Sequence, residues 1–246
     1  MERPKETTTT NNKQLPAWMK STSKLVKDRN ASPSDSFLHE DRPFLKFKGK
    51  VRHSNKIGDC GYVCEAILEK LEGLKELVVG FDLEWPVQWT KGESQHKTAL
   101  IQFSPSVGVC YIFQVTEWKK LPKVFIDFIS HPKVRLVGVN IKADIWKLGR
   151  DFDISVANIV ESNVIELKSL ANQIFSTQEM WSLDRLVLYV LKKQLDKSDV
   201  RTSNWAQKTL TTHQLGYAAT DAYASLLTYL RLKEIEEQNS KDNVAS

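Results

Sequence analysis

Two carboxylates, Asp82 and Glu84, stand at the end of the apolar stretch 77–81. The stretch is short, hydrophobic and bounded by charge and by Pro86, which predicts a buried β-strand. Side chains alternate along a strand, so residues two positions apart face the same way. Because neighbouring carboxylates repel each other and burial of an unpaired charge is costly, a cation is their natural partner. The alternative interpretation is a frayed strand end with two surface acids.

Three more residues extend this pattern. Asp144 follows the apolar stretch 134–139 at the start of a predicted helix, and Tyr217 and Asp221 lie four positions apart in the C-terminal helix, on one face. Taken singly, these would be a helix cap, a core tyrosine and a surface acid. Taken together, they are placed to meet beyond the carboxyl ends of the strands. Four carboxylates suit two Mg²⁺ or Mn²⁺ ions, which can clamp the attacking and leaving oxygens of a phosphodiester.

The elements that must position these residues follow from hydrophobic periodicity. Strands are expected at 45–51 as a half-exposed edge, 77–84, 99–103, 109–115, 134–139 and 159–167, the last running into a helix. Helices are expected at 60–74, 124–129, 142–150, 183–195 with Ser182 as N-cap, and 213–237 capped by Thr211 or Thr212. The order predicts an α/β fold in which an antiparallel meander and then parallel strands form one mixed sheet flanked by helices.

Composition places the chain among globular proteins. Its 246 residues are 41% hydrophobic and 26% charged, which suits one domain with tails. We expect a mobile basic Thr/Ser/Asn-rich tail over 1–42, the folded domain over 43–238 and a flexible C-terminal tail over 239–246. Neither a bilayer-spanning apolar run nor a secretory signal is evident, so no membrane partner is expected. The net charge of +5 fits a partner rich in phosphate, and the three cysteines are expected to be reduced thiols.

Three motifs resemble a known family. FDLEWP, GVNIKAD and YAATDAY resemble, in order, the motifs of the DEDDy 3′–5′ exonucleases, a branch of the DnaQ-like, ribonuclease-H-like superfamily. TALIQF, the run Trp146–Ile154, WSLDRL and RTSNW resemble the Werner syndrome-like exonucleases within that branch. The similarity covers roughly residues 43–232.

The resemblance implies a ribonuclease-H-like fold and a metal-dependent 3′–5′ DNA exonuclease of DNA repair or replication that releases 5′-mononucleotides in the nucleus. Asp82, Glu84 and Asp221 would hold a first Mg²⁺ or Mn²⁺ ion, with Asp82 bridging to a second and Asp144 acting partly through water. Tyr217 would hydrogen-bond the scissile phosphate or the attacking water. Since a phenol ordinarily has a pKa near 10, it is better suited to orient this water than to deprotonate it.

Cations around the acids are the expected phosphate contacts. The candidates are Lys91, Lys97, Lys142, Lys147, Arg150 and Arg201. Trp146 is a candidate for stacking on a terminal base, or alternatively for packing inward. For each single lysine the alternative is an ordinary solvated face.

Other functions stay open at this point. Ribonuclease D shares the same motifs, so a 3′–5′ exoribonuclease is an alternative to a DNA enzyme. A nucleic-acid-binding module without turnover is another, although the complete set of acids argues against it. Werner protein also carries a helicase, whereas this chain has no Walker motif, so a separate helicase or repair proteins are possible partners. Sequence leaves open whether the chain is a whole protein or an excised domain.

Overall fold

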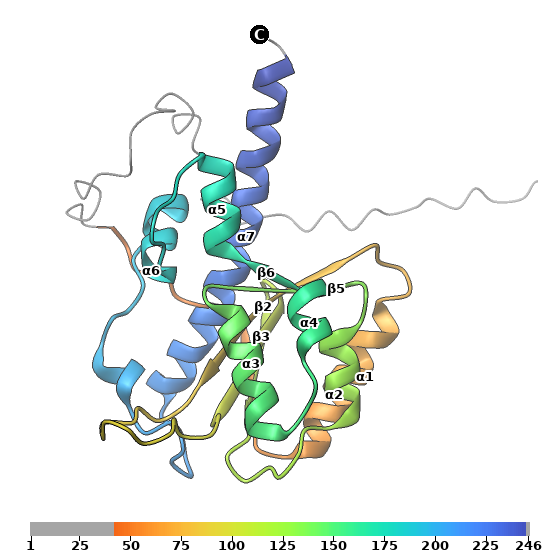
Figure 1. Cartoon of the computed structure of the whole chain (residues 1–246), viewed down its shortest axis with the longest axis vertical. Helices are drawn as coiled ribbons and strands as arrows, with labels where there is room; N and C mark the ends of the chain where they lie inside the picture. Colours follow the sequence, from red (N-terminus) through yellow and green to blue (C-terminus); the bar gives the residue numbers. More distant parts are fainter. Residues whose placement is uncertain (1–41, 245–246) are drawn as a thin grey trace, which may run out of the picture. The chain divides into compact units, whose positions relative to one another are not determined.

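The computed structural model describes residues 42–244 (Figure 1). A six-stranded sheet in the order β1-β4-β3-β2-β5-β6 forms the centre of this part of the chain. Its strands are β1 (Lys50–Ser54), β2 (Leu77–Glu84), β3 (Leu100–Ser106), β4 (Val109–Gln114), β5 (Val134–Gly138) and β6 (Val164–Glu166). The predicted tail over residues 1–42 lies outside the described residues except for Arg42.

The sheet combines two kinds of pairing. β2, β3 and β4 form an antiparallel meander, with Asp82 opposite Gln102. β5 pairs parallel with β2, and β6 pairs parallel with β5. The short turn at residues 107–108 permits the antiparallel pair β3–β4, whereas β5 and β6 are reached through helical connections, as parallel strands require. The prediction of a mixed sheet flanked by helices is confirmed.

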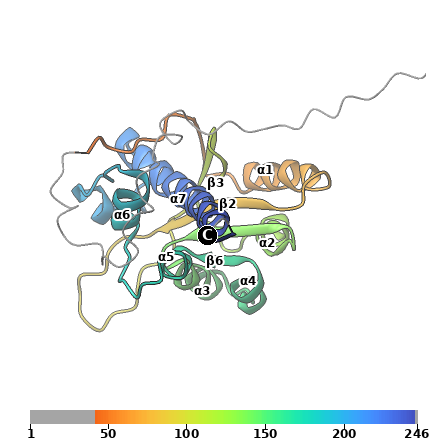
Figure 2. The same cartoon turned by 90° about the horizontal axis from the view of Figure 1, so that it is seen from above.

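Helices cover both faces of the sheet. They are α1 (Ile57–Lys70), α2 (Lys123–Ser130), α3 (Ile141–Phe152), α4 (Ala157–Ser162), α5 (Leu167–Phe175), α6 (Leu183–Leu186), the π-helix η3 (Val187–Leu191), the 3₁₀-helix η4 (Asp199–Thr202) and α7 (Thr212–Val244). α1 to α4 share one hydrophobic cluster with Phe81 and Phe103 of the sheet. α5, α6, η3 and α7 pack with residues such as Leu100 and Val137 of the opposite face. α1 and α6 lie on opposite sides of the described fold in both views (Figures 1 and 2).

Three predicted elements differ from the structure. The edge strand is β1 at 50–54, because residues 43–45 instead pair with Gln194 through backbone hydrogen bonds. The stretch 159–167 is not one strand: 157–162 is α4, and only the three residues of β6 are extended. The predicted helix 183–195 starts with Ser182 as its cap, as expected, but becomes the π-helix η3 and ends at Lys192, whose φ of 54° is left-handed.

The long helix α7 begins with a reciprocal cap. The hydroxyl of Thr211 accepts a hydrogen bond from the backbone N–H of Gln214, and the side-chain oxygen of Gln214 accepts one from the N–H of Thr211. This is a capping box, which satisfies two donors that a helix start leaves free. α7 extends to Val244, so residues 239–244 are helical where a flexible tail was expected to begin. No helix of residues 42–244 combines the length and apolarity needed to cross a bilayer.

The backbones of α7 and β2 are in direct contact at Gly80. A methyl group added to Gly80 would lie 1.9 Å from the carbonyl oxygen of Ala222 and 2.9 Å from the backbone nitrogen of Leu226. Ala218 and Ala222 are fully buried at this contact. Only glycine on the strand and small residues on the helix allow this approach. Since Gly80 precedes Asp82 by two residues and Ala222 follows Asp221, the same contact brings these two acids together.

We predict that Gly80→Ala destabilises the protein by about 1–3 kcal/mol, because the added methyl group forces α7 away from β2. Thermal unfolding followed by circular dichroism measures this as a lower Tm. Gly58→Ala in α1 is the matched control, since no heavy atom lies within 4 Å of its added methyl group. Equal Tm values for the two variants would show that α7 does not depend on this contact.

Candidate active site

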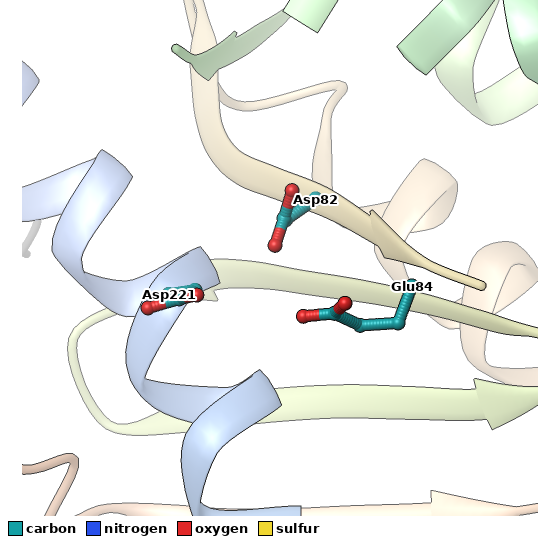
Figure 3. Close-up of side chains that lie close together, drawn as sticks. All are labelled: Asp82, Glu84 and Asp221. Carbon is teal, nitrogen blue, oxygen red and sulfur yellow. The ribbon is translucent and has the colours of Figure 1, made fainter. Parts of the chain in front are cut away.

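Three acids from two elements converge at the end of β2. Asp82 and Glu84 extend from one face of β2, and Asp221 extends from α7 toward them (Figure 3). One carboxylate oxygen of each residue lies within 4.8 Å of those of the other two. Strand alternation aligns the first two carboxylates, and the close contact at Gly80 places the third.

Burial makes this cluster electrostatically costly. Burial raises the pKa of Asp82 to about 7, although hydrogen bonds from the backbone of Leu83 and from Gln102 oppose the rise. The pKa values of Glu84 and Asp221 rise well above their usual range, first through burial and then through repulsion from the neighbouring acids. Removal from water penalises each charge, and like charges add to the penalty.

Asp144 lies beside this cluster rather than within it. It is in the first turn of α3, directly after the turn that leaves β5, and only 8% of it is exposed. Burial, and then repulsion from Asp82 and Glu166, raises its pKa to about 8, while Lys147 acts in the opposite direction. The structure therefore brings the predicted fourth acid within electrostatic reach of Asp82. Sequence analysis did not identify the nearby Glu166, because the parallel pairing of β5 with β6 brings it close.

Tyr217 lies one helical turn before Asp221 on α7. Burial raises its pKa, and the charges of Asp221 and Glu84 raise it further, so the phenol is protonated at neutral pH. Its interaction with the carboxylate of Asp221 raises the pKa of the phenol and lowers that of the acid. The ring packs against Trp205, with 6.0 Å between ring centroids. A neutral phenol in this position is a hydrogen-bond donor rather than a base.

A glutamine that sequence analysis missed contacts the cluster. The Nε2 of Gln102 donates a hydrogen bond of 3.0 Å to Oδ2 of Asp82. The signal was present in the sequence as a polar residue inside the apolar run TALIQF, but its significance depends on the β2–β3 register.

The donor set of the cluster fits a divalent cation. Three carboxylates offer oxygen ligands at close range, and hard cations such as Mg²⁺ and Mn²⁺ prefer oxygen. A bound cation would stabilise the ionised forms that burial now disfavours. These acids could therefore hold a metal ion.

Two lysines predicted to contact phosphate have partners within the protein, although Lys147 is buried and Lys97 is exposed. Lys147, whose side chain is 3% exposed, forms an ion pair with Asp151 at 3.1 Å and donates to the carbonyl of His96 at 2.6 Å. The ammonium of Lys97 donates to the carbonyl of Trp118 at 2.6 Å and lies 4.2 Å from the ring centre of Phe152. The position of Lys147 corrects its assignment, since a buried ammonium has no surface on which to meet a phosphate. Contacts of both lysines stabilise the loop between β2 and β3, and the phosphate contact of the exposed Lys97 stays a prediction.

Three further candidates lie on the outer side of α3. Lys142, Trp146 and Arg150 are exposed and follow one another at intervals of four residues. Each residue turns a helix by about 100°, so Trp146 projects about 200° away from Asp144. Trp146 does not pack inward, as 45% of it is exposed, but this side faces away from the acids. The contacts of these three residues with nucleic acid stay predictions.

Arg201 and Lys91 are the remaining predicted cations. Arg201 in η4 is exposed, and its charge lowers the pKa of Glu84, so it lies within electrostatic reach of the cluster. Lys91 is exposed on the loop that continues β2. Arg201 thus combines two features among the predicted phosphate contacts: it is exposed, and its charge lowers the pKa of an acid of the site.

Comparison with known proteins places this geometry in a family. The model of a 3′–5′ exonuclease family matches residues 59–236. The chain is 38% identical over 227 residues to a 3′–5′ exonuclease of Drosophila yakuba, covering 91% of this chain and 63% of that protein. It is 37% identical over 228 residues to the bifunctional 3′–5′ exonuclease/ATP-dependent helicase WRN of Mus musculus, covering 92% of this chain and 16% of that protein. The chain thus spans less than two thirds of these curated relatives.

The fold has solved counterparts as well. Escherichia coli RNase D, an exoribonuclease involved in structured RNA processing, superimposes with a TM-score of 0.61 at 18% sequence identity. The alignment covers 78% of this chain and 46% of that chain. At this identity the likeness concerns the fold, and it confirms the expected ribonuclease-H-like architecture.

We predict that the metal-free protein loses stability as pH rises. Folded-state pKa values of about 7 for Asp82 and about 8 for Asp144 lie above the ordinary value of 3.8. The folded state therefore binds more protons than the unfolded state between these values, and the free energy of unfolding falls as pH increases. In EDTA, Tm should be lower at pH 8 than at pH 5.5, and Asp82→Asn should reduce the difference. Asp127→Asn, an exposed acid of α2, is the control, and a Tm that rises over this range would contradict the prediction.

Proposed function

Because this chain belongs to the family of 3′–5′ exonucleases, we propose that it hydrolyses DNA from the 3′ end and releases 5′-mononucleotides. The observation that carries the proposal is the convergence of Asp82, Glu84 and Asp221 with their oxygens within 4.8 Å. An acidic, largely buried cluster repels phosphate, so it suits phosphodiester chemistry only if cations bind there.

Two divalent ions, Mg²⁺ or Mn²⁺, are the proposed cofactors, and when bound they would activate the attacking water and stabilise the leaving 3′-oxygen. Asp82, Glu84 and Asp221 are the proposed ligands of the first ion, with Asp82 shared with the second. Asp144 extends the set of acids on the side of α3. Their burial supports this assignment, because ligands fixed in a folded interior are already positioned for a metal ion.

Tyr217 is the proposed group that orients the reacting water or the scissile phosphate. Its protonated phenol lies one helical turn before Asp221, an assigned ligand, and interacts with that carboxylate. A donor held by the packing of its ring against Trp205 has little freedom to reorient. Correct orientation of reacting groups is a large part of catalysis.

DNA is the proposed substrate because a relative of 37% identity is named as both exonuclease and helicase. On the same basis we assign the chain to DNA repair or replication in the nucleus, beside a separate helicase or repair proteins. The alternative is RNA, supported by the fold that the chain shares with RNase D. A binding module without turnover is disfavoured, because a module that only binds phosphate has no need for a buried acidic cluster.

We predict that Asp82→Asn and Asp221→Asn each abolish cleavage while the protein stays folded. Neutralising one acid removes a ligand and also relieves repulsion within the cluster. A 5′-labelled DNA strand with a recessed 3′ end and a matched RNA–DNA hybrid would be incubated with Mg²⁺, Mn²⁺ or EDTA. Shortening from the 3′ end that requires metal and both acids supports the proposal, and the faster substrate decides between DNA and RNA.

Asp127→Asn controls for a general effect of removing a carboxylate, because this side chain is paired with Lys123 at the surface. If Asp82→Asn degraded DNA as fast as the wild type, the assignment of the metal site would be wrong. If the wild type bound both substrates but cleaved neither under any metal, a binding module would replace the enzyme as the better explanation.

We predict that Arg201→Ala weakens DNA binding and lowers its salt dependence by about one unit of slope, as expected for loss of one phosphate contact. Lys142→Ala is the matched control, because it removes one exposed positive charge on the side of α3 away from the acids. Binding to a labelled 3′-recessed duplex would be measured by fluorescence anisotropy from low to high salt, in EDTA. Equal effects of the two substitutions would mean that Arg201 contributes only net charge.

A further inference from the structure

Gln102 is placed by the sheet itself against an acid of the site. β3 pairs antiparallel with β2, and Gln102 is the residue directly opposite Asp82. Directly opposed residues in an antiparallel pair project to the same face. The side chain of Gln102 is fully buried, and its amide nitrogen lies 3.0 Å from Oδ2 of Asp82.

The carbonyl oxygen of the Gln102 amide makes no hydrogen bond within the described residues. This oxygen, Oε1, is buried. Burying a polar group without a partner costs stability, and an apolar side chain of the same length would avoid that cost. Packing and stability alone therefore do not account for a glutamine in the run TALIQF.

A second buried glutamine of the same sheet provides a contrast. Gln114 of β4 is 7% exposed, and its amide nitrogen donates to the backbone carbonyl of Gln207 at 2.6 Å. This bond ties the sheet to the segment that precedes α7, which is a structural role. The amide nitrogen of Gln102 instead donates its hydrogen bond to Asp82, a carboxylate of the acidic cluster.

We infer that Gln102 is a positioning residue that fixes the orientation of the Asp82 carboxylate for metal binding. A carboxylate has about four lone-pair sites; the amide occupies one on Oδ2 and the backbone of Leu83 another, which leaves sites for a cation. Donors in contact with a ligand hold it in orientation, and their loss typically weakens metal affinity by about 10–100-fold. The inference rests on the proposed metal site and adds a specific residue to it.

Metal affinity and stability together test this role. Wild type, Gln102→Met and Gln114→Met would be titrated with Mn²⁺, with the free ion followed by electron paramagnetic resonance, and their Tm measured in EDTA. We expect Gln102→Met to bind Mn²⁺ at least about 10-fold more weakly, with a metal-free Tm equal to or above that of the wild type. We expect Gln114→Met to lower Tm and to leave the Mn²⁺ affinity unchanged.

The outcomes separate this inference from the proposed function. If the wild type binds no Mn²⁺ at the acids, as judged against Asp82→Asn, the metal proposal itself fails. If the wild type binds and Gln102→Met binds equally well, only the positioning role is wrong. A lower Tm without loss of affinity would assign Gln102 a structural role. Gln102→Asn retains the amide but withdraws it from Asp82 by one methylene. If the Met variant does not fold, the Mn²⁺ affinity of Gln102→Asn tests the positioning role in its place.

Discussion

Mutual repulsion of three partly buried carboxylates is the constraint that the contacts around the site must offset. Asp82, Glu84 and Asp221 repel each other when ionised, and they are partly shielded from water, so other contacts must hold their backbones together. The contact of Gly80 with the backbone of α7 is one of these, because it fixes the helix that carries Asp221 against the strand that carries Asp82. Tyr217 shares that helix, so the same contact also places the phenol.

Packing on the far face of the sheet offsets part of this electrostatic cost. Phe103 of β3 lies between aromatic rings of β4 and α2, with centroid distances of 5.4 Å to Phe128 and 6.0 Å to Phe113. Gln102, the preceding residue, points the opposite way toward Asp82. Alternation along one strand thus joins a dense apolar core to the acidic site with no intervening loop. A rigid strand is a suitable support for ligands whose spacing must persist in the absence of metal.

Sequence reasoning located the acids because they depend on local periodicity. Side chains two residues apart on a strand, or four apart on a helix, share a face whatever element packs against them. This local rule was sufficient to group Asp82 with Glu84 and Tyr217 with Asp221. Periodicity also predicted most strands and helices in their succession along the chain, apart from the bounds of β1, the short α4 and the π-helix η3. Contacts across elements were not predictable in this way. Gln102 and Glu166 depend on strand pairing, and the burial of Lys147 depends on the β2–β3 loop, where the carbonyl of His96 accepts a hydrogen bond from its ammonium.

The positive charges near the acids bear on whether metal or nucleic acid binds first. Lys147 lowers the pKa of Asp144 and Arg201 lowers that of Glu84, yet both acids keep raised pKa values. Burial is the largest cause of these rises and repulsion between the acids adds to it, so the two nearby cations do not offset them. A nucleic-acid phosphate would add another negative charge to this region. In the proposed mechanism, divalent cations consequently have two roles: they supply the chemistry, and they make the site electrostatically accessible to its substrate. Productive substrate binding then requires metal to be bound, whereas Arg201, at the exposed margin, can contact phosphate in either state.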